Sequence, residues 1–314
     1  MSLRVLVLGG TGFVGSHVVA NLVTAKHRVI VPTRRRDRGK HLLLLPTVDV
    51  VEADVHDAGR LRELVADADA VVNLVGILHP SGSQTFRRVH VDLARSVIDA
   101  CHRAGVTRLL HMSALGAASD GPSEYLRSKG EAQALVEASD LAWTIFRPSV
   151  VFGRGDSFIG LFAKLVRWMP VVMLAAPGAK FQPVHVRDVA HCIAASVDDR
   201  RTYRQTYALC GPKVYTLREL VTWVGETTGH VRPVIGLGPA LSKLQASLLE
   251  LSPVKLLTRD NLATMSVDAT CSQPFPPLFG IEPSSLEAVA PDYLAPTSIR
   301  SPFDGYRARA GDPR

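Results

Sequence analysis

The sequence has few cysteines, and their spacing excludes two common classes of small domain. Only four are present among 314 residues, at Cys101, Cys192, Cys210 and Cys271, and no two of them have C-x-x-C spacing. Four such cysteines are too few for a disulfide scaffold, and without paired cysteines a zinc site is not expected. We therefore predict reduced thiols in a cytoplasmic protein that holds no metal.

Aromatic residues and long apolar runs are also scarce. Aromatics make up 6% of the chain, which argues against a surface that stacks nucleic-acid bases, so no nucleic-acid partner is expected. No apolar stretch reaches the roughly 18 to 20 residues that cross a bilayer, since the nearest, residues 168–176, is short and contains Pro170. Residues 1–4 lead directly into an apolar run, so no signal peptide is expected.

Positive charge exceeds negative charge, but no single segment concentrates it. The formal net charge is +7 and the pI is about 9.4. Arginine is spread along the chain, which is typical of a solvated basic surface. The alternative is attraction to an anionic partner or to the inner face of a membrane.

Short runs rich in Val, Ile and Leu alternate with amphipathic segments of helix length. This alternation is typical of repeated βα units around a parallel sheet that is covered on both faces. The expected strands are residues 4–8, 28–32, 48–52, 70–75, 108–112 and 142–146. The expected helices begin near residues 12, 58, 86, 123 and 158. The sequence therefore predicts an α/β fold with a doubly wound parallel sheet of the Rossmann type.

The alternation of short apolar runs and helix-length segments ends after Arg147-Pro148, where longer segments are interrupted by glycine and proline. We predict a dinucleotide-binding domain at 1–152, to which the chain returns at 183–212. Residues 184–186 and 206–209 are expected to rejoin its main sheet. A smaller substrate or partner region would comprise 153–182 and 213–294, followed by a loosely held tail at 295–314.

The late segment 239–251 spaces its apolar residues as a helix does. They are Ala240, Leu241, Leu244, Leu248 and Leu251. We favour a core helix here over a docking face for a partner or a membrane surface.

The strongest motif is a glycine turn between the first strand and the first helix. Gly9, Gly12 and Gly15 form G-x-x-G-x-x-G, and Thr11, Phe13 and Val14 complete the turn. The first glycine permits a tight turn, the second lets a diphosphate approach the backbone, and the third lets the helix pack on the strand. The free N–H groups of the helix N-terminus favour the same anion. All six residues are predicted to bind a dinucleotide.

The end of the second strand indicates which dinucleotide is bound. Arg34 and Arg35 follow the strand, and no acidic residue precedes Asp37. An acidic side chain at this place accepts the ribose 2′-hydroxyl of NAD, whereas the planar guanidinium of arginine suits a 2′-phosphate. NADP(H) is therefore favoured over NAD(H), with a basic solvated loop as the alternative.

The ends of the third and fourth strands carry further candidate contacts. Asp54 is placed to accept a hydrogen bond from the adenine amino group, and Asp57 suits the N-cap of the next helix. The fourth strand ends at the carboxyl edge where ligands bind, although its asparagine also suits a turn. The residues predicted to line the cofactor here are Asp54, Val55, Asn73, Val75 and Gly76.

Three residues near the fifth strand suggest acid–base chemistry. Tyr125 and Lys129 are four residues apart in a predicted helix, so they share one face. A neighbouring ammonium lowers the pKa of a tyrosine and lets the pair exchange a proton with a substrate oxygen. Ser113, which follows the strand, would hold that oxygen, or would serve only as a turn residue.

Together these motifs resemble the short-chain dehydrogenase/reductase superfamily, in particular its extended, epimerase-like branch and its atypical members. The resemblance covers about the first 210 residues and includes Arg147-Pro148-Ser149-Val150 and Val184-His185-Val186-Arg187-Asp188. It implies that Pro148 and Val150 pass near the nicotinamide. It also implies that Tyr125 and Lys129 contact the cofactor as well as the substrate.

Residues 111–117 and 125–131 look most like proteins similar to the nucleotide-binding accessory subunit of respiratory complex I. That resemblance implies a structurally held NADPH and a respiratory-complex or membrane-surface partner. His90 stands where extended enzymes often have a catalytic Asn, and a packed histidine is the alternative. Three functions stay open, namely an NADP(H)-dependent reductase, a nucleotide-holding assembly protein, and a sugar-nucleotide epimerase or dehydratase. The residues after Phe152 do not identify a small-molecule substrate.

Overall fold

The computed structural model of the protein describes residues 2–251 and 256–295. Its centre is a seven-stranded sheet in the order β11-β6-β5-β4-β1-β2-β3, and all neighbouring strands are parallel. The strands are β1 (Arg4–Leu8), β2 (Arg28–Thr33), β3 (Val48–Glu52), β4 (Ala70–Asn73), β5 (Arg108–Met112), β6 (Ala142–Pro148) and β11 (Gln205–Leu209). The predicted doubly wound sheet is confirmed.

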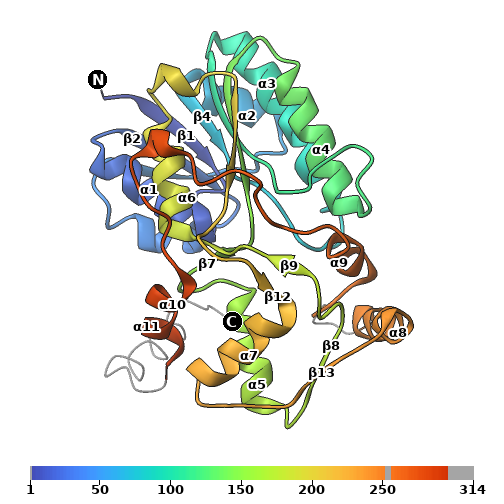
Figure 1. Ribbon diagram of the computed structural model, residues 1–314. Coiled ribbons are helices and arrows are strands. Elements are labelled where there is room, and N and C mark those ends of the chain that lie inside the picture. The colour runs from blue at the N-terminus through green and yellow to red at the C-terminus, as the bar shows by residue number, and fades with distance from the viewer. Residues whose placement is uncertain (1, 252–255, 296–314) are drawn as a thin grey trace.

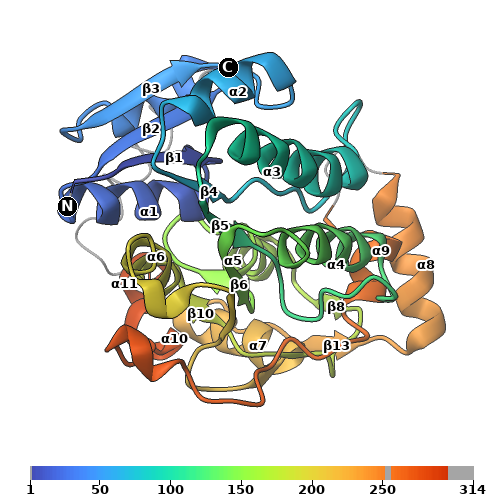
Figure 2. The same ribbon diagram turned by 90° about the horizontal axis from the view of Figure 1, so that it is seen from above.

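Alternate side chains of each strand enter opposite layers, because successive residues of a strand point to opposite faces. In β1, Val5 and Val7 pack with α1 and α6, whereas Leu6 and Leu8 pack with the helices on the other face. Figures 1 and 2 show these two helical layers. The helices of the layers are α1 (Phe13–Thr24), α2 (Ala58–Ala66), α3 (Leu93–Ala104), α4 (Glu124–Glu137) and α6 (Val186–Ala195).

The strand order reverses beside β1, and this reversal positions the site. From β1 the chain moves outward to β2 and β3, then crosses back to β4 and continues through β5 and β6. In such sheets ligands bind at the carboxyl ends of the strands next to the reversal. The glycine turn after β1 and Asn73 at the end of β4 both lie there.

Short connecting elements complete the sheet half of the molecule. β4 ends two residues before its predicted end, because the Asn73 side chain accepts the Val75 N–H and turns the chain. Asp57 caps α2 as predicted, by accepting N–H groups of the first helical turn. The remaining elements of this half are the 3-10 helices η1 (Arg36–Leu42), η3 (Arg200–Thr202) and η4 (Pro277–Phe279) and the π-helical turn η2 (Arg87–Asp92).

A third apolar core lies below the sheet in Figure 1 and is built mainly from α5 and α7. Phe152, Phe162 and Leu220 are among its buried side chains. The helices of this half of the molecule are α5 (Ile159–Trp168), α7 (Leu217–Thr227), α8 (Pro239–Glu250), α9 (Arg259–Thr264), α10 (Leu286–Val289) and α11 (Pro291–Leu294). Its short strands are β7 (Val151–Phe152), β8 (Val172–Leu174), β9 (Lys180–Phe181), β10 (Val184–His185), β12 (Tyr215–Thr216) and β13 (Val234–Gly236).

Two sequence predictions about the returning chain and the cysteines are wrong. Residues 184–185 do not rejoin the main sheet, since β10 pairs with β7, and only β11 extends the sheet beside β6. Val184 still packs in the core beside α1. Cys210 and Cys271 form a disulfide across 61 residues of chain, a closeness that tertiary folding creates and sequence spacing does not reveal. Cys101 and Cys192 are buried free thiols.

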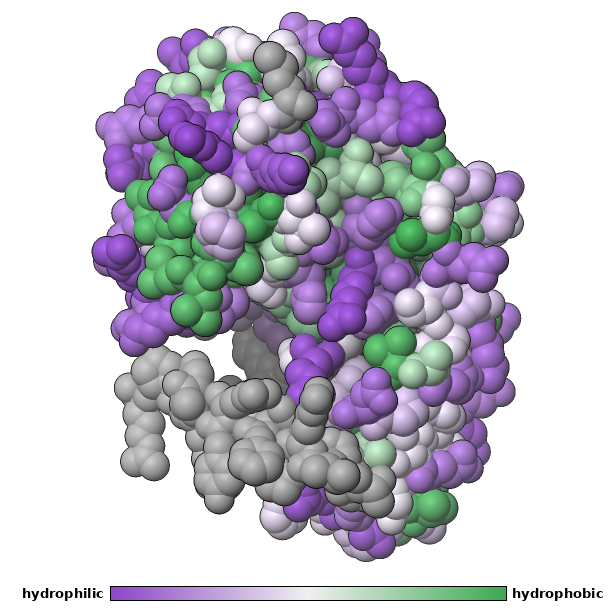
Figure 3. Space-filling model, turned by 90° about the vertical axis from the view of Figure 1, so that its left-hand side faces the viewer, coloured by the Kyte–Doolittle hydropathy of each residue, from purple (hydrophilic) through white to green (hydrophobic). Residues whose placement is uncertain are grey.

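The prediction that α8 is a core helix is also wrong. Its small residues Ser242 and Ala246 are buried, whereas Leu244 and Leu248 are 56% and 61% exposed. Small side chains allow the helix backbone to approach its neighbours, which leaves the leucines outside. The opposite side of the molecule, seen in Figure 3, is largely hydrophilic with apolar areas on the sheet half.

Two further sequence predictions concern the end of the chain and the membrane. Apart from residue 295, the predicted tail lies outside the described residues. Within the part of the chain that the structure describes, no helix has both the length and the apolar character needed to cross a bilayer.

Candidate cofactor and active site

The glycine turn has the shape that a diphosphate needs. Gly9 adopts a left-handed conformation with φ of 81°, and a Cβ there would lie 3.1 Å from the carbonyl carbon of Leu74. A Cβ on Gly15 would overlap the carbonyl oxygen of Gly9, so only glycine lets α1 pack this close to the turn. At Gly12 a Cβ would meet only the Gly9 oxygen, at 3.2 Å. The middle glycine thus leaves a bare, accessible stretch of backbone.

The N-terminus of α1 opens into this turn. Gly12 is the N-cap, no side chain caps the helix, and its first turn holds no acidic residue. Uncapped N–H groups of a helix carry partial positive charge and bind phosphate oxygens. The predicted diphosphate contacts from Gly12 through Gly15 therefore lie on one exposed helix end.

Arg34 and Arg35 emerge at the end of β2, on the side of the site where the adenosine is expected. Both side chains are exposed, and the Thr33 hydroxyl donates to the Arg35 carbonyl oxygen. The nearest acid, Asp37, is paired with Lys40 at 2.8 Å between Nζ and Oδ1, and this pairing lowers the Asp37 pKa. Both guanidinium groups thus reach solvent at the strand end.

Asp54 and Val55 lie nearby, after β3. The Asp54 carboxylate accepts the His56 N–H at 3.0 Å, so Asp54 stabilises its own turn. Burial lowers the His56 pKa, the Asp54 carboxylate opposes this shift, and the charges of Arg88 and Arg34 add to it. Arg34 and Asp54 are therefore both within electrostatic range of the His56 ring.

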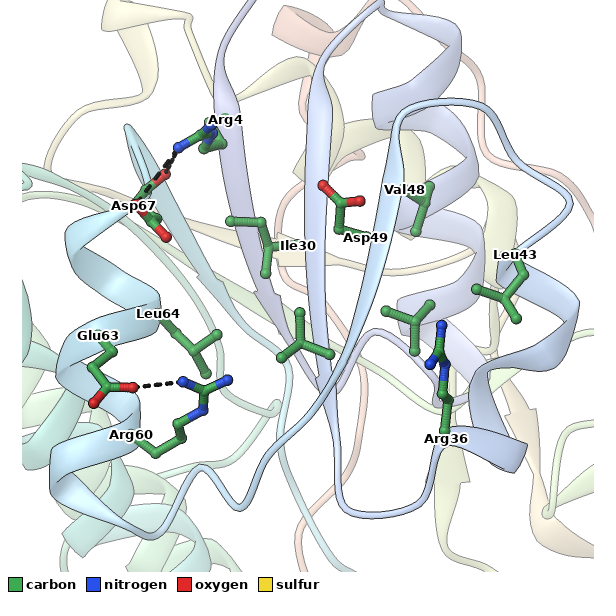
Figure 4. A pocket seen from close by; sticks show the side chains of 12 residues that line it. Arg4, Ile30, Arg36, Leu43, Val48, Asp49, Arg60, Glu63, Leu64 and Asp67 are labelled. Carbon is green, nitrogen blue, oxygen red and sulfur yellow. Dashed lines mark hydrogen bonds and ion pairs between the residues drawn. The ribbon is translucent and has the colours of Figure 1, made fainter.

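A separate cavity of about 460 Å³ opens on the face of β2 and β3, between α2 and η1. Figure 4 shows Arg36 and Arg60 reaching over it, with Arg60 paired to Glu63 and Arg4 to Asp67. None of the residues predicted to bind the cofactor lines this cavity. The candidate site is instead the carboxyl edge of the sheet.

The ends of β4 and β5 place three buried polar residues side by side. Asn73 Nδ2 lies 3.4 Å from His111 Nδ1. Burial lowers the His111 pKa to about 3, so this ring is neutral at physiological pH. Among the described residues, His111 Nε2 and the Ser113 hydroxyl have no hydrogen-bond partner although both are buried. Buried polar groups are rarely left unsatisfied, and a bound ligand is one way of satisfying them.

Lys129 and Tyr125 converge on the same edge from α4. The Lys129 ammonium donates to the Met112 carbonyl at 3.0 Å and lies 3.2 Å from the position that a Cβ on Gly76 would occupy. Burial lowers the Lys129 pKa to about 8. Burial also raises the Tyr125 pKa to about 12. The predicted lowering of the Tyr125 pKa by Lys129 is thus not seen, because desolvation of the phenol dominates.

His90 joins α4 to the loop after β4. Its Nε2 accepts the Ile77 N–H at 3.2 Å, and its Nδ1 lies 2.8 Å from the Ser128 hydroxyl. Burial, together with the charge of Lys129, lowers the His90 pKa to about 2. The ring is therefore a neutral packed group, and its contacts fix the backbone beside Gly76.

Three supporting residues escaped the sequence analysis. Phe86 packs its ring against His90 and Tyr125, with centroids 5.6 and 5.9 Å away. Ser128 stands between His90 and the Tyr125 carbonyl, to which its hydroxyl donates. Its place inside the Tyr-x-x-x-Lys motif was an available signal. Asp260 of α9 accepts the Tyr125 N–H from 135 residues further along the chain, for which no sequence signal exists.

Pro148 ends β6 at the same edge, and Val150 lies in the short connection to β7. The Val150 carbonyl accepts the Val184 N–H, and a Cβ on Gly153 would lie 3.4 Å from the Phe13 ring. This connection therefore passes beside the N-terminus of α1. The bare glycine turn, the uncapped helix and the unpartnered Ser113 hydroxyl together fit a dinucleotide. Fold and site define a dinucleotide-binding protein of the Rossmann class.

Residues 9–161 match the NAD(P)H-binding family. The chain belongs to an NAD(P)-binding family that resembles the short-chain dehydrogenases/reductases. It is 32% identical over 290 residues to the mitochondrial NADH dehydrogenase (ubiquinone) 1 alpha subcomplex subunit 9 of Mus musculus, with 90% of this chain and 77% of that protein covered. A ceramide reductase of Caulobacter vibrioides is 31% identical over 194 residues, which cover 61% of this chain and 60% of the reductase.

Solved structures share the fold at lower identity. The NADPH complex of an NADPH-dependent quinone oxidoreductase from Escherichia coli has a TM-score of 0.73 and 18% identity, with 91% of this chain and 98% of that chain covered. The NAD complex of UDP-glucose 4-epimerase from Thermus thermophilus has a TM-score of 0.62 and 23% identity, with 75% and 87% covered. The same fold thus accommodates either dinucleotide.

Proposed function

We propose that the protein binds NADP(H) and reduces a carbonyl group of a small-molecule substrate, with Tyr125, Lys129 and Ser113 acting on the substrate oxygen. The observation that carries this proposal is the Ser113 hydroxyl, which is buried without a partner among the described residues. It follows β5 directly, next to the Met112 carbonyl that holds Lys129. An unsatisfied buried hydroxyl costs about 1–3 kcal/mol, which a substrate oxygen would recover.

The protonation states favour the reductive direction. When bound, the nicotinamide supplies the hydride. With a pKa of about 12, Tyr125 is protonated at pH 7 and is therefore a proton donor to the carbonyl oxygen. Lys129, with a pKa of about 8, is mainly an ammonium at pH 7, and its charge stabilises the negative charge that develops on that oxygen. Ser113 orients the oxygen between them.

The preference for NADP(H) rests on Arg34 and Arg35. Each presents an exposed guanidinium at the end of β2, and the nearest acid is occupied by Lys40. A guanidinium binds a phosphate with two parallel hydrogen bonds, and no acidic residue lies between the end of β2 and Asp37, where a side chain that accepts a ribose 2′-hydroxyl is usual. Asp54, Val55, Asn73, Val75, Gly76, Pro148 and Val150 would line the rest of the cofactor.

The reductase proposal is tested with Tyr125→Phe. We expect loss of NADPH oxidation with a panel of aliphatic and aromatic ketones, while NADPH affinity changes less than about twofold, because the glycine turn and the arginines would supply most of the contacts with the nucleotide. Tyr207→Phe, which removes a hydroxyl from the far strand β11, is the matched control and should keep activity. Turnover that survives Tyr125→Phe would remove Tyr125 from the mechanism.

A second function is supported by the similarity to the mitochondrial NADH dehydrogenase subunit and by His90 in the place of the usual Asn. In this function the protein holds its nucleotide as a structural element and assembles with a respiratory complex at the cytoplasmic face of a membrane. Cells that lack the protein would be complemented with Tyr125→Phe. Restored assembly of the membrane NADH dehydrogenase favours this second function, and failure favours the reductase.

A further inference from the structure

An apolar surface remains uncovered on α8 and the neighbouring β8–β13 pair. Six large side chains form it, and between 52% and 84% of each is exposed. We call it the α8 face, which consists of Met173, Ile235, Leu241, Leu244, Leu248 and Leu251. Monomeric proteins rarely expose contiguous apolar patches of this kind unless the patch binds something.

The six side chains lie together because of how α8 meets the β8–β13 pair. Spacings of three and four residues put the four leucines on one side of α8, opposite the buried Ser242 and Ala246. Gln245 follows Leu241 by one helical turn, and its amide donates to the Met173 carbonyl at 2.9 Å. Met173 is in register with Ile235 on the neighbouring strand, so both point outward from one side of that pair.

Figures 1 and 2 show where the helix of this face lies. In both views α8 lies at the rim of the molecule, outside α9. The leucines point away from the packed side of the helix, so no described element covers them. A flat, rim-exposed leucine stripe is the form that an interfacial amphipathic helix takes.

The charge of the surrounding chain shows which kind of surface would cover it. Residues 157–187 and 227–249, which supply every side chain of the face except Leu251, contain no Asp or Glu. Glu250, which precedes Leu251, is paired with Arg259 at 2.8 Å. The same ranges contain cationic side chains, among them Lys164, Arg167, Arg232 and Lys243. Trp168, 79% exposed at the end of α5, continues the apolar run toward β8. Leucine and tryptophan flanked by an excess of cations complement anionic lipid headgroups.

We propose that the α8 face docks the protein on a bilayer that contains anionic phospholipids. The leucines enter the boundary between headgroups and acyl chains, and the lysine and arginine side chains bind phosphate groups. Because α9 lies between α8 and the N-terminus of α4, docking holds the Tyr125 site close to the membrane. The proposal concerns this surface alone and does not depend on whether the site reduces a substrate.

The test uses the full chain and two sets of vesicles, phosphatidylcholine alone and phosphatidylcholine mixed with phosphatidylglycerol. Leu244→Gln combined with Leu248→Gln should weaken binding to the mixed vesicles by at least about tenfold, since both side chains lose apolar burial. Leu43→Gln combined with Leu44→Gln is the matched control, because these leucines are 47% and 86% exposed near η1, on the sheet half. The control should bind as the wild type does, and high salt should weaken both.

Several outcomes overturn the proposal. If the wild-type protein does not bind the mixed vesicles, or binds both vesicle types equally, the proposed anionic membrane partner is wrong. Equal losses of binding in the α8 and η1 variants would show that the protein adsorbs to the vesicles through any exposed apolar side chains. Sedimentation equilibrium provides the last arm, since a wild-type dimer that the α8 variant dissociates would make this face an interface between copies. Unchanged NADPH affinity and melting temperature confirm that the α8 variant is folded.

Discussion

Replacing Lys129 with methionine should stabilise the nucleotide-free protein while abolishing turnover. The Lys129 side chain is 3% exposed, and burial lowers its pKa from 10.5 to about 8. A pKa difference of this size corresponds to about 3 kcal/mol by which the folded state disfavours the ammonium. Methionine keeps most of the apolar stem but loses the hydrogen bond to the Met112 carbonyl, which contributes about 1 kcal/mol. We therefore expect the free energy of unfolding at pH 7 to rise by about 2 kcal/mol.

The effect has a defined pH window. The folded-state pKa of Lys129 is lower than the unfolded-state pKa, so the unfolded chain binds more protons between about pH 8 and pH 10.5. Wild-type stability should therefore rise with pH through this window. The advantage of Lys129→Met is complete below pH 8 and disappears as the pH approaches 10.5.

Urea unfolding of nucleotide-free protein at pH 7 and at about pH 10 measures both quantities. Lys164→Met is the matched control, because Lys164 is exposed on α5 and should show neither effect. If Lys129→Met proves less stable than the wild type at pH 7, the ammonium is not held at an energetic cost. In that case the lowering of the Lys129 pKa by burial is wrong.

Three more predictions follow from the geometry. Gly15→Ala should abolish dinucleotide binding and lower the melting temperature, because its Cβ would overlap the Gly9 oxygen. Gly160→Ala in α5 is the control, because a Cβ there meets open space, and the same thermal scan should show a neutral or slightly stabilising effect. Cys271→Ser should lower the free energy of unfolding by about 2–4 kcal/mol, and addition of a thiol reductant to the wild type should reproduce that loss. His90→Phe should weaken NADPH binding about tenfold, because the Ile77 N–H loses its acceptor. A fluorescence titration should give the same loss at every pH from 5 to 8, because the His90 ring of the wild type stays neutral over this range.

The sheet could be predicted from the sequence because its strands are short apolar runs, each followed by a recognisable helix start. Gly9 and Gly15 required only steric arguments, which the structure bears out, and the approach of a diphosphate to Gly12 stays a prediction. The same reasoning failed where a pattern has two physical outcomes. A helix with one apolar face is compatible with burial and with exposure, and the small residues Ser242 and Ala246 decide the outcome by allowing close packing on the other side.

Contacts distant in the sequence were beyond prediction for a different reason. The Cys210–Cys271 bond and the Asp260 contact with Tyr125 each join residues brought together only by the folded chain. The pKa of Tyr125 is a similar case, because the Lys129 spacing is visible in the sequence but the degree of desolvation is not.

Asp260 has a mechanical consequence for the reactive tyrosine. Its carboxylate accepts both the Glu124 and Tyr125 N–H groups, so the first turn of α4 is fastened to a short helix from the far end of the fold. A displacement of α9 would therefore be transmitted through these two hydrogen bonds to the first turn of α4. The position of the Tyr125 phenol is therefore set both by the sheet on which α4 packs and by Asp260 of α9.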